Sequence, residues 1–236
     1  MNLRNRSHKK ELLDQEDIPF AEIRTNLREL NVINTYLGGH RITLEGVQQL
    51  AKGKRPLHIC EIGCGGGDNL VAIRKWCTRK QIPVYFTGID IKEACISFAR
   101  SKNELSGCTD WVINDYKNVT LSPKPDIIFS SLFCHHFSGE ELVNQLAWMH
   151  DQSSSGFFIN DLHRQAIAYY SIRLLSRLFS KSRLLKNDAP LSVAKGFRKK
   201  EWQMLLASAG LKGYRIHWKW AFRHLIIFQH DGKQTL

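Results

Sequence analysis

A glycine-rich turn preceded by an acid is the part of the sequence best suited to holding a ligand. The segment LHICEIGCGGGDNL, residues 57–70, runs from an apolar stretch into Glu61 and then into four glycines interrupted only by Cys64. Glycines at a turn from strand to helix let a ligand lie against the backbone. The acid favours a cationic or hydroxyl-bearing ligand over a pyrophosphate. The dinucleotide pattern G-x-G-x-x-G fails, because Asp68 replaces its third glycine when the count starts at Gly63.

Acidic and amide side chains end the next two strand-like segments. Asp90 ends VYFTGID, where a carboxylate can accept hydrogen bonds from both hydroxyls of a ribose. Asn114 and Asp115 follow WVI, at a place suited to the exocyclic amine of an adenine. An ordinary turn or helix cap is the alternative role for Asp115.

Three histidines are candidates for acid–base chemistry. His135 and His136 follow the apolar run DIIFSS, and His163 stands beside Asp161 after GFFIN. An imidazole that titrates near neutrality can deprotonate a phenol, quinol or enol, and a neighbouring Asp can orient it. Each of the three is therefore a candidate base, with local packing or capping as the alternative for the pair.

An α/β scaffold is needed to bring these strand ends together. Apolar segments alternate with helical ones, and strands are expected at residues 57–62, 84–90, 111–114, 126–131 and 156–161. Helices are expected at about residues 67–78, 92–103, 138–150 and 198–210. This alternation predicts a doubly wound, mostly parallel sheet that binds its ligand at the carboxyl ends of the strands. Residues 211–230 predict a closing antiparallel pair.

Two segments outside the alternation are expected to cover the site. Residues 9–52 have a helical pattern, so residues 1–52 are expected to form an N-terminal helical extension ahead of a domain over residues 53–236. Residues 163–197 are expected to form a helical lid. From residue 163 to residue 200 there are ten lysines and arginines against one acid, Asp188, among many apolar neighbours. Such a segment suits a basic-rimmed apolar pocket or an amphipathic helix with a solvated basic face.

Composition narrows the class of protein. The formal net charge of +12 is compatible with nucleic acid, an anionic membrane, an acidic carrier protein or simple solubility. The six cysteines form no C-x-x-C pair, so reduced thiols are expected rather than disulfides or a metal site. No spanning helix and no secretory signal are expected, which predicts a cytoplasmic protein, with peripheral membrane association left open.

Three motifs carry a family resemblance. EIGCGGG, GIDI and NDY resemble, in order and spacing, the first three motifs of class I S-adenosylmethionine-dependent methyltransferases, over roughly residues 55–230. The resemblance implies a Rossmann-like sheet of seven mostly parallel strands with a reversed last strand, and S-adenosyl-L-methionine as cofactor. The residues implied for the cofactor are Glu61, Gly63, Cys64, Gly65, Gly67, Asp90, Ile91, Asn114, Asp115, Tyr116 and Ser131.

The acceptor is implied by other segments. The residues after DIIFSS lack the P-P-aromatic motif of enzymes that methylate base amines, and LFCHHF resembles small-molecule methyltransferases of bacterial quinone and aromatic polyketide pathways. NTYLGGH and KNDAPLSVAKGF show a looser resemblance to methyltransferases of polyketide or alkylresorcinol-type pathways. Methylation of a hydroxyl on a small hydrophobic or anionic aromatic acceptor is implied, with carbon methylation close behind. The residues expected near the acceptor are Tyr36, His40, Arg41, Phe133, Tyr169 and Tyr170.

Other functions remain open at this point. An RNA or protein methyltransferase that binds through the basic lid is the main alternative, although the apolar neighbours of the basic residues favour a membrane, a carrier protein or an apolar ligand over nucleic acid. A non-catalytic cofactor-binding protein is disfavoured by the intact motifs beside a histidine pair. A nicotinamide-dependent oxidoreductase is disfavoured by the missing glycine. The oligomeric state is open.

Overall fold

The sheet has the predicted topology. The structure is a computed structural model that describes residues 3–15, 17–51, 53 and 56–230. Within these residues one seven-stranded sheet has the order β3-β2-β1-β4-β5-β7-β6, with β7 antiparallel to β5 and β6 and the other pairs parallel. The strands are β1 (Leu57–Ile62), β2 (Val84–Asp90), β3 (Thr109–Ile113), β4 (Ile127–Ser131), β5 (Gly156–Leu162), β6 (Arg215–Lys219) and β7 (Arg223–Gln229). The prediction of a doubly wound sheet with a reversed last strand is confirmed.

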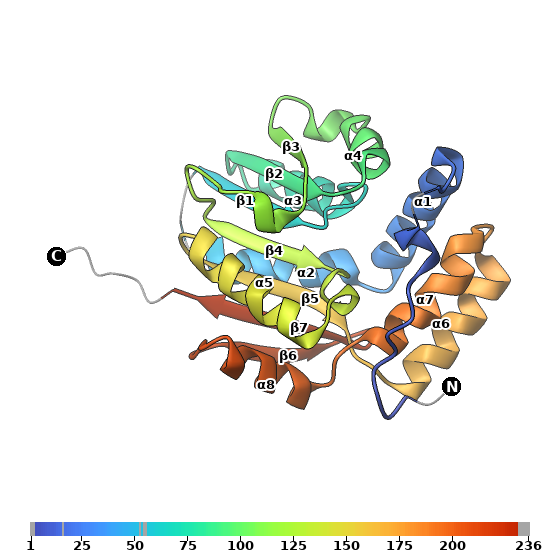
Figure 1. Ribbon diagram of the computed structural model, residues 1–236. Helices are drawn as coiled ribbons and strands as arrows, with labels where there is room; N and C mark the ends of the chain where they lie inside the picture. Colours follow the sequence, from blue (N-terminus) through green and yellow to red (C-terminus); the bar gives the residue numbers. More distant parts are fainter. Residues whose placement is uncertain (1–2, 16, 52, 54–55, 231–236) are drawn as a thin grey trace.

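Helices cover both faces of this sheet (Figure 1). They are α1 (Phe20–Tyr36), α2 (Gly39–Ala51), α3 (Asp68–Arg79), α4 (Glu93–Arg100), α5 (Gly139–Gln152), α6 (Ala166–Phe179), α7 (Arg183–Lys195) and α8 (Lys199–Ser208). Apolar side chains of α2 and α3 pack on one face, and those of α5 and α8 pack on the other. The predicted domain boundary between residues 52 and 53 falls beside positions outside the described residues.

Successive side chains of β1 point to opposite faces of the sheet, so this strand contributes to the apolar core on both faces. Leu57 and Ile59 face the α2–α3 side, whereas Cys60 and Ile62 face the α5–α8 side. All four are buried, and a fully buried side chain of this size contributes about 1.5–3 kcal/mol. All six cysteines are free thiols. No helix of the described chain is both long enough and apolar enough to span a bilayer.

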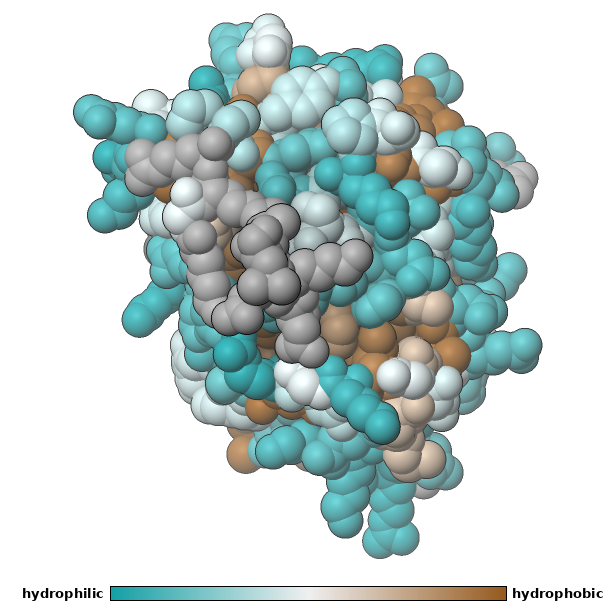
Figure 2. All heavy atoms as spheres, turned by 90° about the vertical axis from the view of Figure 1, so that its left-hand side faces the viewer, coloured by the Kyte–Doolittle hydropathy of each residue, from teal (hydrophilic) through white to brown (hydrophobic). Residues whose placement is uncertain are grey.

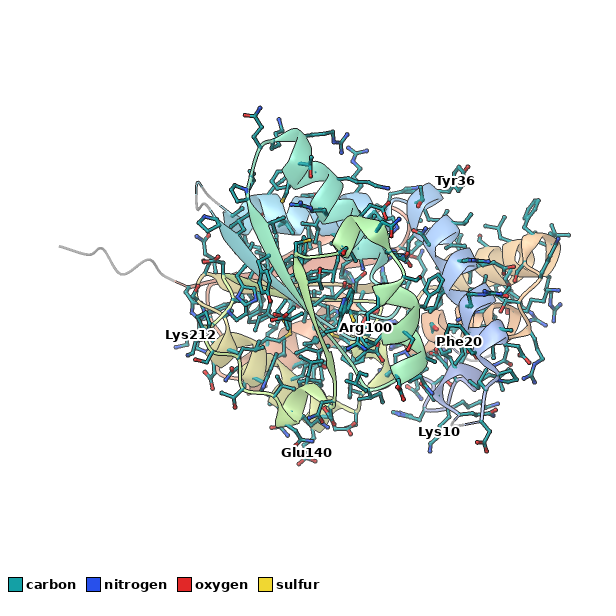
Figure 3. The ribbon with its side chains drawn as sticks, turned by 90° about the horizontal axis from the view of Figure 1, so that it is seen from above. Lys10, Phe20, Tyr36, Arg100, Glu140 and Lys212 are labelled. Carbon is teal, nitrogen blue, oxygen red and sulfur yellow. The ribbon has the colours of Figure 1, made fainter. Side chains whose placement is uncertain are left out.

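The carboxyl ends of the parallel strands meet the N-terminal segment, α1, α6 and α7, at the right of Figure 1. Figure 3 shows the same order from above: α1 lies between the sheet and the pair α6 and α7. The opposite end of the molecule, shown in Figure 2, is largely hydrophilic around a smaller apolar area. The end that carries α6 and α7 is therefore the one where a ligand of the sheet would lie.

One prediction about the covering segments needs correction. Residues 9–15, expected to be helical, are extended apart from a 3₁₀ turn at Leu12–Asp14. The physical reason is tertiary: the carboxylate of Asp188 accepts hydrogen bonds from the backbone N–H groups of Leu12 (2.8 Å) and Leu13 (2.9 Å). The insertion of residues 163–197, expected to be helical, forms two helices that pack against each other, α6 and α7. We call residues 3–15 the N-terminal strap.

Candidate active site

The glycine turn joins β1 to α3 and requires glycine at specific positions. Gly63, Gly65 and Gly67 have φ of 63°, 50° and 70°, the left-handed region that other residues rarely adopt. A Cβ on Gly63 would lie 2.2 Å from the ring of Phe133. Gly67 is the N-cap of α3. The turn therefore keeps its backbone open to a ligand only with this sequence.

Glu61 is a buried carboxylate with one oxygen unused by the protein. Its Oε1 accepts a hydrogen bond from Asn69 Nδ2 at 2.8 Å, whereas its Oε2 has no hydrogen-bond partner among the described residues. Burial raises the pKa of Glu61 well above its usual value, although the hydrogen bond from Asn69 opposes this. A cationic group of a ligand would satisfy Oε2 and favour the ionised form. The methionyl ammonium of S-adenosylmethionine fits this requirement.

Asp90 is fixed beside the turn by two backbone groups. Its Oδ2 accepts from Gly65 N and its Oδ1 from Lys92 N, both at 2.9 Å. Burial raises the pKa of Asp90, and the two hydrogen bonds counteract part of that increase. Each oxygen keeps a further lone pair for a ribose hydroxyl. Asp115 accepts from Lys117 N at 3.1 Å, so its carboxylate does cap a 3₁₀ turn, while the residue also faces the cavity described next.

A cavity of about 440 Å³, the cofactor cavity, opens above these residues. All the residues predicted for the cofactor line it except Gly67, which lies in the turn but is not among the described residues that line the cavity. Residues that the prediction missed also line it: Leu13, Asp14, Leu27, Leu30, Asn34, Gly66, Asp68, Asn69, Lys92, Cys95, Leu132 and Phe137. Leu27 and Leu30 could have been predicted, because their helical spacing places them on one face of α1. No local sequence pattern distinguishes Leu13 and Asp14.

His135 is buried between two carboxylates. Its Nδ1 donates to Asp161 Oδ1 at 2.8 Å, its backbone N donates to Asp161 Oδ2 at 3.0 Å, and its Nε2 lies 3.6 Å from Glu11 Oε1. Burial alone would lower the pKa of His135, but Asp161 and Glu11 outweigh it and raise the pKa to about 9. This imidazole is therefore protonated at neutral pH.

His136 occupies a different position although it is adjacent in sequence. Its Nδ1 lies 3.3 Å from Asp14 Oδ1 and 3.4 Å from Lys195 Nζ, and its Nε2 lies 3.7 Å from Glu11 Oε2. It is partly exposed and lines both the cofactor cavity and a second cavity. Of the three predicted histidines, this one borders both spaces.

Glu11 is a central residue that sequence reasoning missed. Its Oε1 accepts from Lys195 Nζ at 3.0 Å and from Ser192 Oγ at 2.9 Å. Burial opposes ionisation of Glu11, but His135, His136 and Lys195 outweigh it and lower its pKa. Nothing in KKELLDQ distinguishes Glu11, because its partners are brought to it only by the fold.

The group Glu11, His135 and His136 also has the composition of a metal site. Their ligand atoms all lie within 4.8 Å of one another. Lys195, however, already places its ammonium 3.0 Å from Glu11 and 3.4 Å from His136. A metal ion at the same place would be repelled by this cation, so we interpret the group as an ion-pair network.

The second cavity, which we call the acceptor cavity, measures about 390 Å³ and is mainly apolar. It shares Leu13, Leu30, Leu132 and His136 with the cofactor cavity. Its apolar wall comprises Ile33, Leu37, Leu162, Ala168, Ile172, Leu175, Leu185, Ala189, Val193, Trp220, Ala221 and Phe222. The two cavities therefore meet at one wall that carries an imidazole.

Arg223 is a buried cation on the wall of the acceptor cavity. Its Nη2 donates to Asn34 Oδ1 at 2.8 Å, whereas its Nη1 has no hydrogen-bond partner among the described residues. Burial lowers the pKa of Arg223 to about 10, with Asp161 opposing the shift, so the side chain stays protonated at neutral pH. An unpaired donor of this kind is a suitable partner for an anionic oxygen of a ligand.

His163 does not join the other histidines, which corrects the prediction that Asp161 orients it. Asp161 binds His135 instead, while His163 N donates to Phe222 O at 2.8 Å and its ring packs on His224. His163 lines a separate cavity with Leu3 and Arg4, and burial lowers its pKa.

Most residues predicted near the acceptor lie elsewhere. Tyr36 is 83% exposed and points outward at the end of α1 (Figure 3), and Arg41 is also exposed. Tyr169 packs into a small core with Val193, and Tyr170 lines the cavity that contains His163. These four residues were expected there from a resemblance and from the composition of the insertion, and neither fixes the direction of a side chain about its helix.

Two of the predicted acceptor residues serve the cofactor cavity instead. Phe133 lines it and packs against Gly63. His40 bridges Asn69 Oδ1 (3.0 Å) and Asn31 Oδ1 (2.9 Å), and thus holds the amide that donates to Glu61. His40 is therefore a positioning residue one step behind the cavity wall.

Comparisons with known proteins agree with this geometry. A family model described as a methyltransferase domain matches residues 59–156. The structure is similar to the plantazolicin methyltransferase BpumL in complex with SAH (TM-score 0.65, 20% identity, 90% of this chain and 89% of that chain). It is similar to an O-methyltransferase family 2 protein from Planctomyces limnophilus in complex with apigenin (TM-score 0.65, 15% identity, 92% and 63%). Human N-acetylserotonin methyltransferase in complex with SAM is a further match (TM-score 0.64, 15% identity, 91% and 57%).

At these identities the likeness to solved structures is one of fold. The chain spans less than two thirds of the length of the human and Planctomyces proteins. No protein of curated function matches the chain in sequence.

Proposed function

We propose that the chain uses S-adenosylmethionine to methylate a hydroxyl oxygen of a small apolar aromatic acceptor, with His136 as the general base; the proposal is supported by the methyltransferase-domain match over residues 59–156 and by the fold shared with methyltransferases solved with SAM or SAH. The observation that carries the proposal is the place of His136 on the wall between the cofactor cavity and the acceptor cavity. A base at that wall reaches an acceptor hydroxyl that faces the transferable methyl group.

The chemistry requires only that the acceptor lose a proton as its oxygen gains the methyl group. The cofactor supplies an electrophilic methyl group on a sulfonium. His136 would accept the hydroxyl proton while the acceptor oxygen takes the methyl group from the sulfonium, so that the products would be a methyl ether and S-adenosylhomocysteine. The carboxylates of Glu11 and Asp14 lie within 4 Å of the imidazole and would face the positive charge that His136 gains, with the ammonium of Lys195, 3.4 Å from Nδ1, opposing them.

His135 supports this assignment by being a poor alternative base. With its pKa at about 9 it already holds a proton at neutral pH. Its role in the proposal is to fix the η4 turn (Cys134–His136) against Asp161 and thereby to position His136. His163, in its separate cavity, has no part in it.

The walls of the acceptor cavity support the acceptor class. An apolar space of about 390 Å³ suits a small aromatic molecule, and the unpaired Nη1 of Arg223 suits a phenolate or carboxylate oxygen on it. Two of the similar structures carry the names of small aromatic molecules, N-acetylserotonin and apigenin. Carbon methylation of the same ring would need the same base.

The test begins with the acceptor. Purified protein is incubated with radiolabelled S-adenosylmethionine and a bacterial extract, and the products are separated into organic-soluble, RNA and protein fractions. We expect label in the organic-soluble fraction, from which the product is identified. Label confined to RNA or protein would overturn the proposal and favour a macromolecular acceptor.

Once the acceptor is identified, the turnover of the variant His136→Gln is compared with that of His163→Gln. Loss of a general base typically lowers turnover by about 10²–10⁴-fold. We expect that loss for His136→Gln with unchanged S-adenosylhomocysteine affinity by calorimetry, and near wild-type turnover for His163→Gln. Full turnover of His136→Gln would rule out this histidine as the base.

A further inference from the structure

The outer face of α6 exposes a continuous stripe of large apolar side chains. Leu174, Leu178 and Phe179 are 59%, 65% and 78% exposed, and Ile167, Tyr170 and Leu175 are exposed as well. Their spacing of three and four residues places them along one side of the helix. α6 lies at the outer edge of the molecule in both Figure 1 and Figure 3, so neighbouring elements of the described chain leave this side uncovered.

The rest of α6 makes this exposure unusual. Its inner side is also apolar, with Ala168, Tyr169 and Ile172 packed against α7 and its neighbours. Its polar residues are Ser171 and Ser176, of which Ser176 is buried, and Arg173 and Arg177, which flank the exposed stripe. A helix that is apolar nearly all round is normally buried, and a patch of this kind on a surface usually marks a binding face.

The charges beside the stripe select an anionic partner. Arg173 and Arg177 flank it and Lys181 follows it, whereas α6 contains no acidic residue. Of the described residues, no acid lies within 4.0 Å of the guanidinium of Arg173 or Arg177. The whole chain carries a formal charge of +12. A second copy docked face to face would bring these arginines together, so like charges disfavour a dimer through this face.

The stripe is continuous with the acceptor cavity. Leu175 belongs to both, and Trp220, which lines the cavity, is itself exposed. A surface that contacts this stripe therefore also lies beside the mouth of the cavity. Tryptophan is enriched where a protein meets the boundary between lipid and water.

We propose that α6 docks the enzyme on an anionic lipid bilayer, with the apolar stripe among the acyl chains and Arg173, Arg177 and Lys181 at the headgroups. An amphipathic helix that lies in the plane of the interface binds in this way without spanning the membrane. Docking places the mouth of the acceptor cavity at the lipid surface, so that an apolar acceptor enters from the bilayer; this second part rests on the proposed function.

The test uses the full chain and vesicles of phosphatidylcholine alone or mixed with phosphatidylglycerol. We expect sedimentation with the anionic vesicles, weakened by added salt, and little with phosphatidylcholine alone. The double variant Leu174→Ser/Leu178→Ser should bind at least about tenfold more weakly, and Arg173→Gln/Arg177→Gln should lose the preference for anionic lipid. The matched control is Met204→Ser, which changes a side chain 69% exposed on α8 and should bind like the wild type.

Several outcomes would overturn the docking proposal. They are failure of the wild type to bind anionic vesicles, equal binding by the leucine variant, or a wild-type dimer in light scattering that the leucine variant converts to monomer. S-adenosylhomocysteine affinity is measured in every variant to verify the fold. If the enzyme methylates a small acceptor in detergent but does not bind vesicles, only the docking proposal is contradicted. If it binds vesicles but methylates no small molecule, only the proposed function is contradicted.

Discussion

Two adjacent histidines have different roles because their surroundings differ. His135 is enclosed, with Asp161 on Nδ1 and Glu11 near Nε2, and these charges keep it protonated. His136 reaches the wall shared by two cavities and contacts a carboxylate and an ammonium at once. The pair therefore combines a buried cation that holds the turn with a partly exposed imidazole that lines both cavities.

The first prediction concerns the charge on His135. Its folded pKa of about 9 lies above the ordinary value of 6.5, so the stabilisation by its charge is complete below about pH 6.5 and is lost as the pH rises through 9. The difference in free energy of unfolding between the wild type and His135→Gln should therefore shrink over that window, by on the order of 3 kcal/mol. Urea denaturation at several pH values measures it, and a constant difference would contradict the ion-pair arrangement.

Single residues were predictable where the chemistry is local. Glu61, Asp90 and Asp115 end strands next to a glycine turn, so their place at one sheet edge follows from topology. Glu11 and Arg223 were not predictable, since each acts through partners that are distant in sequence. The directions of Tyr36, which is exposed, and Tyr169, which packs against Val193, were not predictable, because the rotation of a side chain about a helix depends on what the helix packs against.

The N-terminal strap is an element held in place by other elements rather than by its own structure. Asp188 and Lys195 of α7 bind Leu12, Leu13 and Glu11. Arg6 adds hydrogen bonds to the carbonyls of His135 and Phe137 (both 3.0 Å). The active site is thus assembled from a loop after β4, a strap and a helix of the insertion.

We expect Asp188→Ala to release the strap. The change removes two hydrogen bonds to a charged acceptor, each worth about 1.5–3 kcal/mol. Hydrogen–deuterium exchange should rise in residues 3–15 and turnover should fall, because Glu11 no longer holds the histidines. Lys186→Ala, on the exposed side of the same helix, is the control and should change neither quantity. Unaltered exchange in the strap of Asp188→Ala would show that other contacts hold it.

At the level of elements, the sheet was predictable and its cover was not. The strands and helices of the domain were predictable because their apolar residues recur every two residues in strands and every 3.6 residues in helices, and these residues face the core of the structure. The strap has a helical pattern in sequence, but contacts with Asp188 override that local preference. The two helices of the insertion were expected as one lid, since periodicity does not reveal how α6 and α7 pack.

The described part of the chain forms one sheet, and the cofactor and acceptor cavities lie at the same edge of it. Cofactor and acceptor approach a common wall from different sides, and the apolar stripe of α6 lies beside the acceptor side. The fold class followed from the alternation of segments. The shape of the acceptor cavity did not, because α1, α6, α7 and the segment before β7 build it together.

Ligand binding gives a prediction for the molecule as a whole. S-adenosylhomocysteine at a hundred times its dissociation constant should stabilise the fold by about 2.7 kcal/mol. For a chain of this size that corresponds to a rise in melting temperature of roughly 5–10 °C. NADH should cause no shift. A shift with NADH and none with S-adenosylhomocysteine would contradict the cofactor assignment.

The contacts of the strap also bear on how the protein is made. Leu12 and Asp188 are 176 residues apart in the chain, and Glu11 and Lys195 are 184 apart. During synthesis on the ribosome, Glu11 emerges long before its partners exist, while the sheet strands from β1 to β5 are translated in between. The nascent chain therefore carries every residue that lines the cofactor cavity, up to Phe137, before it carries Lys195, which binds Glu11. The acceptor cavity is completed later still, because Trp220, Phe222 and Arg223, which line it, follow α7 in the chain.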